Sequence, residues 1–188
     1  SSNAATVILC LIEMFNIDCK KDFHKSLFSL GADIPFCFCR KSAIVTGKGE
    51  NILKIENNYK NFFVLLVNPM IEVSTKKIFE KLTIPPREGF TIFDEKFLSN
   101  TQIIDFLNSR TNDLEKPAIL QCEEIKNILD VFKNETNSLL SRMTGSGSTC
   151  FALFKNKKDL GNAERIFRNK FKNFWVKKTK IVNSFDTL

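Results

Sequence analysis

The chain has 188 residues, of which 43% are hydrophobic and 26% are charged, and its formal net charge is +7. This length can form one or two domains with a sizeable core, and the composition excludes an intrinsically disordered protein. The positive charge would suit a nucleic-acid-binding protein, but the lysines are scattered and no aromatic-and-basic RNA-binding pattern is present, so a solvated basic surface is favoured.

Neither the apolar runs nor the cysteines indicate a membrane protein or a zinc site. The longest apolar run, Ala4 to Ile12, is too short to span a bilayer, and no basic and hydrophobic export leader is seen. The chain has six cysteines without a CxxC pair, and the single His24 leaves no second imidazole for zinc. Free, buried thiols in a cytoplasmic protein are therefore expected.

The first residues, Ser1-Ser2-Asn3-Ala4-Ala5, run without a break into an apolar segment. Ser-Asn-Ala is also a common cleavage scar, but this continuity favours a native segment. Ser1 and Ser2 can cap a helix whose free N–H groups and positive dipole end would receive phosphate. From Ala4 to Phe15 that helix is apolar nearly all round, which predicts burial. Because residue 1 is Ser and not Met, we expect a processed, engineered or partial chain.

A second helix is predicted where Phe23, Leu27 and Leu30 share one face, and Gly31 ends it. The next segment holds Asp33 and Pro35. Proline disfavours a helical conformation in the residue before it, so an extended or turn conformation is expected there. Taken alone, Asp33 is interpreted as an exposed cap or turn carboxylate.

Two strands are predicted at 36–39 and 42–45, around the basic turn at 40–41. Residues 47–50, Gly-Lys-Gly-Glu, are predicted to form a turn, which is interpreted as the connection of a β-hairpin. The polar stretch 51–60 marks a domain boundary, which divides the chain into domains at 1–59 and 60–188.

The second predicted domain begins with a buried strand at 62–67, closed by Asn68-Pro69, and a helix at 76–82 that Ser74-Thr75 opens. A Pro- and Gly-containing loop follows at 85–89, and helices are expected around 103–107, 114–120 and 125–132. Strands at 139–143 and 149–154, a helix at 159–171 and a strand at 175–182 complete the chain. Strand, helix, paired strands, helix and strand form a ferredoxin-like α+β plan with added helices.

The loop between the paired strands, Met143-Thr144-Gly145-Ser146-Gly147-Ser148-Thr149-Cys150, has two glycines one residue apart with hydroxyl residues around them. Such a backbone turns tightly and can bring several N–H groups close to an anion. Taken alone, the loop is better explained as an ordinary Gly/Ser hairpin turn.

Six segments, in this order along the chain, together resemble the GHMP kinases: 1–5, 30–35, 47–50, 68–76, 112–115 and 143–150. The resemblance is greatest to the members that phosphorylate a cytidine diphosphate-linked sugar alcohol of non-mevalonate isoprenoid biosynthesis. It implies a two-domain α+β fold that lacks its N-terminal part here. Residues 1–59 would be the remainder of the ATP-binding domain, and residues 60–188 would be the ferredoxin-like C-terminal domain.

The resemblance also implies an ATP- and Mg²⁺-dependent transfer of phosphate to the 2-hydroxyl of that substrate. Asp33 would be the catalytic carboxylate that orients the hydroxyl or accepts its proton. Thr75 and Phe79 would contact the substrate, although helix capping and core packing explain these two residues equally well. The implied contacts are Ser1, Ser2, Asn3, Gly145, Ser146, Gly147 and Ser148 for the nucleotide, Ser2 for the metal, and Thr75 and Phe79 for the substrate.

The resemblance has departures, and other functions stay open. Lys48 stands where the family usually has a small apolar residue, and the segment 112–115 is interpreted as structural. The family's N-terminal lysine and the aromatic and His residues of its cytidine pocket have no match, so these 188 residues alone are expected to be weakly active or inactive. The alternatives are a homoserine or mevalonate-type GHMP kinase, a non-catalytic remnant that acts as a binding module, and a basic nucleic-acid-binding domain. A monomer or homodimer without nucleic-acid or membrane partners is expected.

Overall fold

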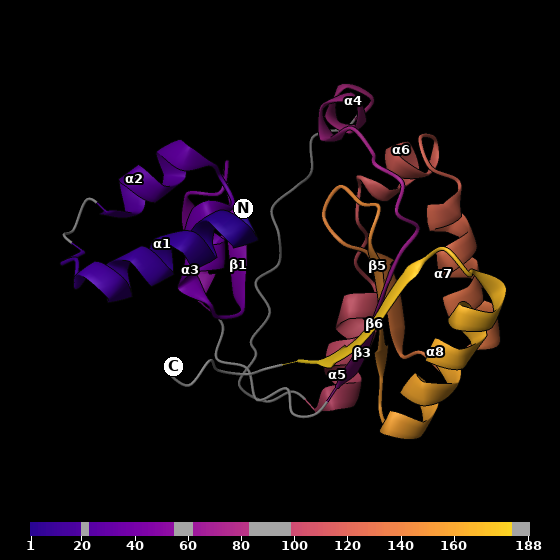
Figure 1. The fold of residues 1–188 in the computed structure, drawn as a ribbon. Helices are drawn as coiled ribbons and strands as arrows, with labels where there is room; N and C mark the ends of the chain where they lie inside the picture. Colours follow the sequence, from indigo (N-terminus) through magenta and orange to yellow (C-terminus); the bar gives the residue numbers. More distant parts are fainter. Residues whose placement is uncertain (20–22, 55–61, 83–98, 182–188) are drawn as a thin grey trace. The chain divides into compact units, whose positions relative to one another are not determined.

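The computed structural model describes residues 1–19, 23–54, 62–82 and 99–181. Their helices and strands fall into two compact units, an N-terminal unit within residues 1–58 and a C-terminal unit within residues 59–181 (Figure 1). That these units correspond to the domains expected at 1–59 and 60–188 stays a prediction. The loop expected at 85–89, residues 55–60 of the polar stretch and residue 182 of the last strand lie outside the described residues.

The N-terminal unit contains three helices and a β-hairpin among its described residues. They are α1 (Ser2–Phe15), α2 (Phe23–Leu30), α3 (Ile34–Cys39), β1 (Ala43–Thr46) and β2 (Asn51–Lys54). Ala5 of α1, Leu27 of α2 and Ile34 of α3 are buried together and form the small core of this unit. β1 and β2 pair in antiparallel register across the turn at 47–50, as the hairpin interpretation predicts.

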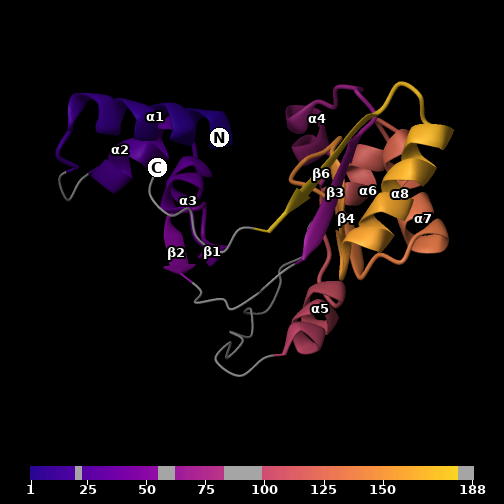
Figure 2. The same ribbon diagram turned by 60° about the horizontal axis from the view of Figure 1, so that its bottom comes forward.

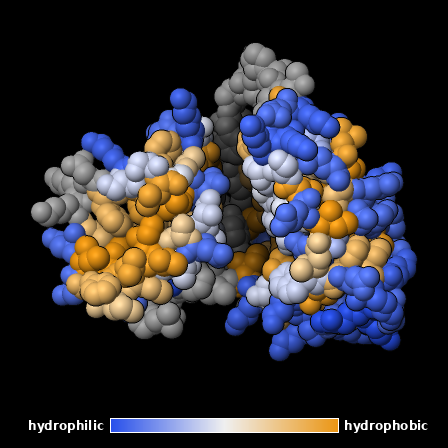
Figure 3. All heavy atoms as spheres, turned by 45° about the horizontal axis from the view of Figure 1, so that its top comes forward, coloured by the Kyte–Doolittle hydropathy of each residue, from blue (hydrophilic) through white to orange (hydrophobic). Residues whose placement is uncertain are grey.

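The helical conformation of α1 is confirmed, but the predicted burial is wrong. Only Ala5 of this helix is buried, whereas Val7 is 57% exposed and Met14 is 73% exposed. Figure 3 shows apolar side chains gathered on the surface of this unit. An apolar sequence makes an apolar helix surface, but burial needs packing partners on every side, and α3 covers only part of α1.

The strand expected at 36–39 is also wrong, because these residues form α3. Pro35 lies in the first turn, where its missing N–H is not needed and its fixed φ suits a helix. Ile34 and Pro35 are both buried, so packing outweighs the local preference of a residue before proline. β2 occupies the start of the stretch that was predicted to be only a polar boundary.

The C-terminal unit is built on a four-stranded antiparallel sheet with the order β4-β5-β3-β6 (Figure 2). The strands are β3 (Phe63–Asn68), β4 (Leu140–Met143), β5 (Cys150–Phe154) and β6 (Trp175–Lys180). In the middle of the sheet, Val67 lies opposite both Cys150 and Val176. This strand order is that of the ferredoxin-like fold, so the predicted α+β architecture is confirmed.

Alternate residues of β3 pack into different cores, because successive side chains of a strand point to opposite faces. Leu65 and Val67 pack into the larger core, together with the fully buried Phe132 and Phe167. Val64 packs into a smaller core with Ile104 on the other face.

The helices of the C-terminal unit are α4 (Thr75–Glu80), α5 (Asn100–Asn108), α6 (Glu115–Ile119), α7 (Glu124–Glu135) and α8 (Lys157–Lys170).

Helices α7 and α8 lie side by side along one face of the sheet, and α5 contacts β4 (Figures 1 and 2). Glu164 of α8 forms ion pairs with Arg168 at 3.1 Å and with Lys178 of β6 at 2.6 Å. The hydrogen bond from Lys178 is the main reason that the pKa of Glu164 lies below its ordinary value. Among the described helices, none combines the length and the apolarity that crossing a bilayer requires.

The described cysteines are all free thiols, as expected, but only Cys122 and Cys150 are buried. Cys10 and Cys19 are exposed, which corrects the expectation of buried thiols. Burial raises the pKa of Cys150 to about 12, so this thiol at the start of β5 stays protonated at neutral pH.

Candidate functional site

The glycine loop, residues 144–149, closes the hairpin between β4 and β5. The N–H of Thr144 donates to the carbonyl oxygen of Thr149 at 2.9 Å, and the N–H of Gly147 donates to that of Thr144 at 2.9 Å. Gly145 and Gly147 have φ angles of +50° and +92°, which side-chain-bearing residues rarely adopt. The hairpin-turn interpretation therefore describes the local backbone correctly.

Three side chains also tie the glycine loop to the end of β3 and the start of α4. Ser148 is buried, and its hydroxyl donates to the carbonyl oxygen of Ile71 at 2.7 Å. Asn68 donates from Nδ2 to the hydroxyl of Thr149 at 2.8 Å. The hydroxyls of Thr75 and Ser146 share a hydrogen bond of 2.9 Å. An isolated hairpin would have none of these links, so the loop is held from outside its own strands.

The structure distinguishes between the interpretations of Thr75 and Phe79 that the sequence left open. The N-cap of α4 is Ser74, whose hydroxyl accepts a hydrogen bond from the N–H of Lys77 at 3.3 Å. Thr75 is thus free of the capping role, and its hydroxyl binds the glycine loop instead. Phe79 is 56% exposed, so core packing does not explain it. Contact of either residue with a substrate stays a prediction.

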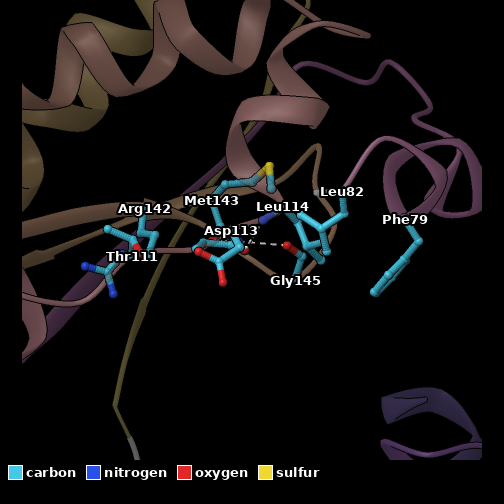
Figure 4. Close-up of a pocket in the computed structure, with 9 residues that line it drawn as sticks. Phe79, Leu82, Thr111, Asp113, Leu114, Arg142, Met143 and Gly145 are labelled. Atoms are coloured by element: carbon cyan, nitrogen blue, oxygen red, sulfur yellow. Dashed lines mark hydrogen bonds between the residues drawn. The ribbon is translucent and has the colours of Figure 1, made fainter. Parts of the chain in front are cut away.

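A pocket of about 480 Å³ opens beside the glycine loop. Figure 4 shows Phe79 on one side of it, with Asp113, Leu114 and Gly145 on the other. The lining residues are Phe79, Leu82, Thr111, Asn112, Asp113, Leu114, Arg142, Met143 and Gly145. The predicted substrate contact Phe79 and the predicted nucleotide contact Gly145 therefore share one pocket within the C-terminal unit.

The sequence placed Asn112 in a segment interpreted as structural, but it did not predict the contacts of this residue at the pocket. Asn112 donates from Nδ2 to the carbonyl oxygens of Met143 at 3.1 Å and Gly145 at 2.8 Å. Its Oδ1 accepts from the N–H of Leu114 at 3.0 Å. A local signal was present, since Asn readily hydrogen-bonds the backbone two residues on, but its partners at 143 and 145 are set by the tertiary fold.

Arg142 forms another wall of the pocket and is held by the backbone. Its guanidinium donates to the carbonyl oxygens of Leu107 and Arg110, each at 2.7 Å. Burial lowers the pKa of Arg142, and the nearby Glu115 carboxylate opposes this shift. The guanidinium thus stabilises the end of α5 against β4.

In the N-terminal unit, Ser1, Ser2 and Asn3 are exposed at the start of α1. Ser1 is the N-cap, yet its side chain makes no capping hydrogen bond. The first N–H groups of an α-helix have no partner inside the helix and carry its positive dipole end. This helix start therefore fits a phosphate group, as the nucleotide prediction requires.

Asp33 belongs to the same unit and is the N-cap of α3. Its side chain is exposed and makes no capping hydrogen bond, so the carboxylate is not used by the helix. Burial raises the pKa of Cys37, the amino group of Ser1 lowers it, and the carboxylate of Asp33 raises it. Helix α3, which begins directly after Asp33, packs against α1.

The turn at 47–50 also lies close to Asp33. A Cβ atom placed on Gly49 would come within 2.6 Å of the carbonyl oxygen of Ala32. Gly49 has a φ angle of +110°, so only glycine suits this close approach. The approach of Asp33 to the glycine loop, which belongs to the other unit, stays a prediction.

Within the part of the chain that the structure describes, no group of three or more His, Cys, Asp or Glu side chains could hold a metal ion.

The two glycines of the loop are expected to differ in their tolerance of substitution. A Cβ on Gly147 would lie 2.8 Å from Sδ of the buried Met143, whereas a Cβ on Gly145 would meet nothing within 4 Å. We expect Gly147→Ala to lower the free energy of unfolding by about 2–4 kcal/mol, and Gly145→Ala by about 1–2 kcal/mol. Urea denaturation of both variants checks this, and equal losses would contradict it.

Comparison with known proteins shows what this chain is similar to. Residues 94–173 match the family model described as GHMP kinases C terminal. The chain is 30% identical over 187 residues to the 4-diphosphocytidyl-2-C-methyl-D-erythritol kinase of Anaplasma phagocytophilum, a match that includes 99% of this chain. The C-terminal unit is thus similar to the C-terminal part of the GHMP kinases. The match with the Anaplasma protein runs along nearly the whole of this chain, including both units.

Further relatives carry the same name. The 4-diphosphocytidyl-2-C-methyl-D-erythritol kinases of Clostridioides difficile and Ehrlichia canis are 32% and 33% identical to this chain, over 94% and 89% of its length. The chain spans 62%, 60% and 59% of the length of the Anaplasma, Clostridioides and Ehrlichia proteins.

Solved structures of the family share the fold. A crystal structure of 4-(cytidine 5'-diphospho)-2C-methyl-D-erythritol kinase matches with a TM-score of 0.65 and 21% identity, over 93% of this chain and 62% of that one. Homoserine kinase from Cytophaga hutchinsonii matches with a TM-score of 0.54 and 13% identity, over 86% of this chain and 58% of that one. At these identities the likeness establishes the fold alone.

Proposed function

We propose that this protein is an ATP-dependent kinase that phosphorylates the 2-hydroxyl of 4-diphosphocytidyl-2-C-methyl-D-erythritol, in non-mevalonate isoprenoid biosynthesis. The observation that carries the proposal is the similarity to a kinase of that name along 99% of this chain. The geometry supports it, because an open helix start and a carboxylate lie in one unit, and a glycine loop with a pocket lies in the other. We place the protein in the cytoplasm, as a monomer or homodimer.

The residues of two elements are proposed to hold the nucleotide. ATP, with Mg²⁺ on its phosphate oxygens, supplies the phosphoryl group when bound. The N–H groups at Ser1, Ser2 and Asn3 would bind phosphate oxygens at the helix start, with the hydroxyl of Ser2 beside the metal. The backbone of Gly145–Ser148 is also proposed to bind phosphate oxygens of the nucleotide. Because phosphoryl transfer needs mainly positioning and charge stabilisation, these phosphate contacts would supply most of the catalytic effect.

Asp33 is proposed to act on the hydroxyl that is phosphorylated. An exposed carboxylate without a capping hydrogen bond is available to accept one from a substrate hydroxyl. At about 3 Å from that oxygen, the carboxylate would orient the hydroxyl and accept its proton, as the new bond to the γ-phosphorus forms and the bond from that phosphorus to the departing ADP breaks. Thr75 and Phe79 are proposed to contact the cytidine end of the substrate, since neither is needed for capping or core packing.

The proposal is tested with the protein expressed from its whole reading frame. ADP release is measured in a coupled assay with three acceptors: 4-diphosphocytidyl-2-C-methyl-D-erythritol, homoserine and mevalonate. We expect ATP- and Mg²⁺-dependent release with the cytidine-linked acceptor alone. Turnover of homoserine or mevalonate instead would assign another GHMP activity. No release with any acceptor would favour the non-catalytic binding module.

Nucleic-acid binding is tested separately, because the net charge is +7. Filter binding over a series of salt concentrations should give no steeply salt-dependent retention of DNA or RNA. Retention that falls steeply with salt would instead support the nucleic-acid-binding alternative.

A further inference from the structure

The amide of Asn112 joins three backbone groups from two separate segments of the chain. Its Nδ2 contacts the carbonyl oxygens of Met143 and Gly145, which stand on either side of the corner where β4 enters the glycine loop. Its Oδ1 accepts from the N–H of Leu114, just before α6 begins. One half-buried amide therefore connects the start of α6 to the loop.

The neighbouring Glu115 acts on the same corner. Its Oε2 accepts from the N–H of Met143 at 3.4 Å, so both the N–H and the carbonyl oxygen of Met143 are bound by the segment 112–115. The two residues hold the last residue of β4 in a single orientation. The carbonyl of Gly145 is then directed towards Asn112, where its oxygen lies 2.8 Å from Nδ2.

The orientation of that carbonyl matters for the rest of the loop. A peptide group is planar, so the Gly145 carbonyl also sets the direction in which the N–H of Ser146 points. Binding the oxygen on the Asn112 side turns this N–H to the opposite side. An anion-binding loop needs its N–H groups, and not its carbonyl oxygens, to face the anion.

We infer that Asn112 is a positioning residue that fixes the backbone of the glycine loop in the orientation required for phosphate binding. The inference rests on the proposed function for its consequence, and on the hydrogen bonds of Asn112 for its structural part. An amide is required, because the site needs two donors and one acceptor from a single side chain. A carboxylate of the same shape keeps the acceptor but presents an oxygen to two carbonyl oxygens.

Two variants of Asn112 separate its donor and acceptor roles, and a third variant serves as the control. Asn112→Asp removes the donors and keeps the acceptor, and Asn112→Ala removes both. Asn108→Asp is the matched control, because Asn108 also donates from Nδ2 to a backbone carbonyl, that of Leu139 at 3.0 Å. Leu139 precedes the other end of β4, so this variant breaks a similar bond away from the loop.

Amide hydrogen exchange is the first measurement. We expect the N–H groups of Thr144 and Gly147 to exchange at least about 10-fold faster in both Asn112 variants than in the wild type, since their hydrogen bonds close the loop. The N–H of Leu114 should lose protection only in Asn112→Ala. Central strand β3 should be unchanged throughout, and Asn108→Asp should leave the loop amides as in the wild type. Unchanged loop exchange in Asn112→Asp would overturn the inference.

Nucleotide binding is the second measurement, on the protein from its whole reading frame. In Asn112→Asp we expect the Kd of ATP with Mg²⁺ to rise on the order of 10-fold, with the KM of the acceptor unchanged. Faster loop exchange without weaker ATP binding would overturn the positioning role. A wild-type protein that neither binds ATP nor releases ADP would overturn the proposed function instead, and the exchange rates would still decide whether Asn112 holds the loop.

Discussion

Asp33→Asn is expected to lower the turnover number by on the order of 100-fold or more, while ATP binding stays near normal. The amide keeps the shape of the side chain but cannot accept the proton of the attacking hydroxyl. The variant should fold normally, because Asp33 is exposed, makes no capping hydrogen bond, and Asn is an equally good N-cap. Steady-state ADP release and calorimetric titration with ATP give the two quantities.

Asp18→Asn is the matched control for Asp33. Asp18 is an exposed carboxylate of the same unit that has no proposed role. Asp18→Asn removes the same negative charge as Asp33→Asn, so any general effect of the net charge on nucleotide binding appears in both variants. Turnover of Asp33→Asn equal to that of the control would remove Asp33 from the mechanism.

Phe132→Ala is expected to lower the free energy of unfolding by about 3–5 kcal/mol, a large share of the stability of a typical domain. Phe132 is fully buried between α7 and the sheet, and its ring centroid lies 4.5 Å from that of Phe167. Removing the ring leaves a cavity in the larger core that its neighbours, Phe167 of α8 among them, fill only in part. Urea denaturation followed by circular dichroism measures the loss.

Phe79→Ala is the control for Phe132 and should show the opposite pattern. Because the Phe79 side chain is 56% exposed, its removal is expected to change the free energy of unfolding by less than about 1 kcal/mol. The same variant should raise the KM of the cytidine-linked acceptor. Similar stability losses in both variants would contradict the assignment of Phe132 to the core and Phe79 to the pocket.

The sequence predicted the C-terminal unit well because its strands and helices carry strong local signals. The run Phe62 to Val67 is apolar throughout, as expected of a strand that is buried on both faces, and it became β3 between two cores. The N-cap Ser74 and the apolar spacing of α7 likewise placed helices within a few residues. Their order was enough to predict the ferredoxin-like sheet.

The N-terminal unit shows where local signals fail. Residues 36–39, Phe-Cys-Phe-Cys, have the aromatic content of a strand, yet Pro35 at a helix start and the burial of Ile34 make them part of α3. The apolar α1 was predicted to be buried, but its surroundings leave side chains such as Met14 exposed. Both errors arise because burial depends on which elements pack together, and a residue's own sequence neighbours do not determine this.

The sequence by itself determined the chemical repertoire of this protein: a carboxylate before a proline, hydroxyls at a helix start, and two glycines between strands. It also determined the order of the C-terminal elements, since hydrophobic periodicity and turn residues act over a few residues. Only the tertiary structure decided that Thr75 binds Ser146, and that Asn112 binds the backbone of Met143 and Gly145. These partners lie 31 to 71 residues apart in the chain. A hydrogen bond requires its two atoms within about 3 Å, a condition that strand pairing and helix packing impose and that sequence spacing cannot.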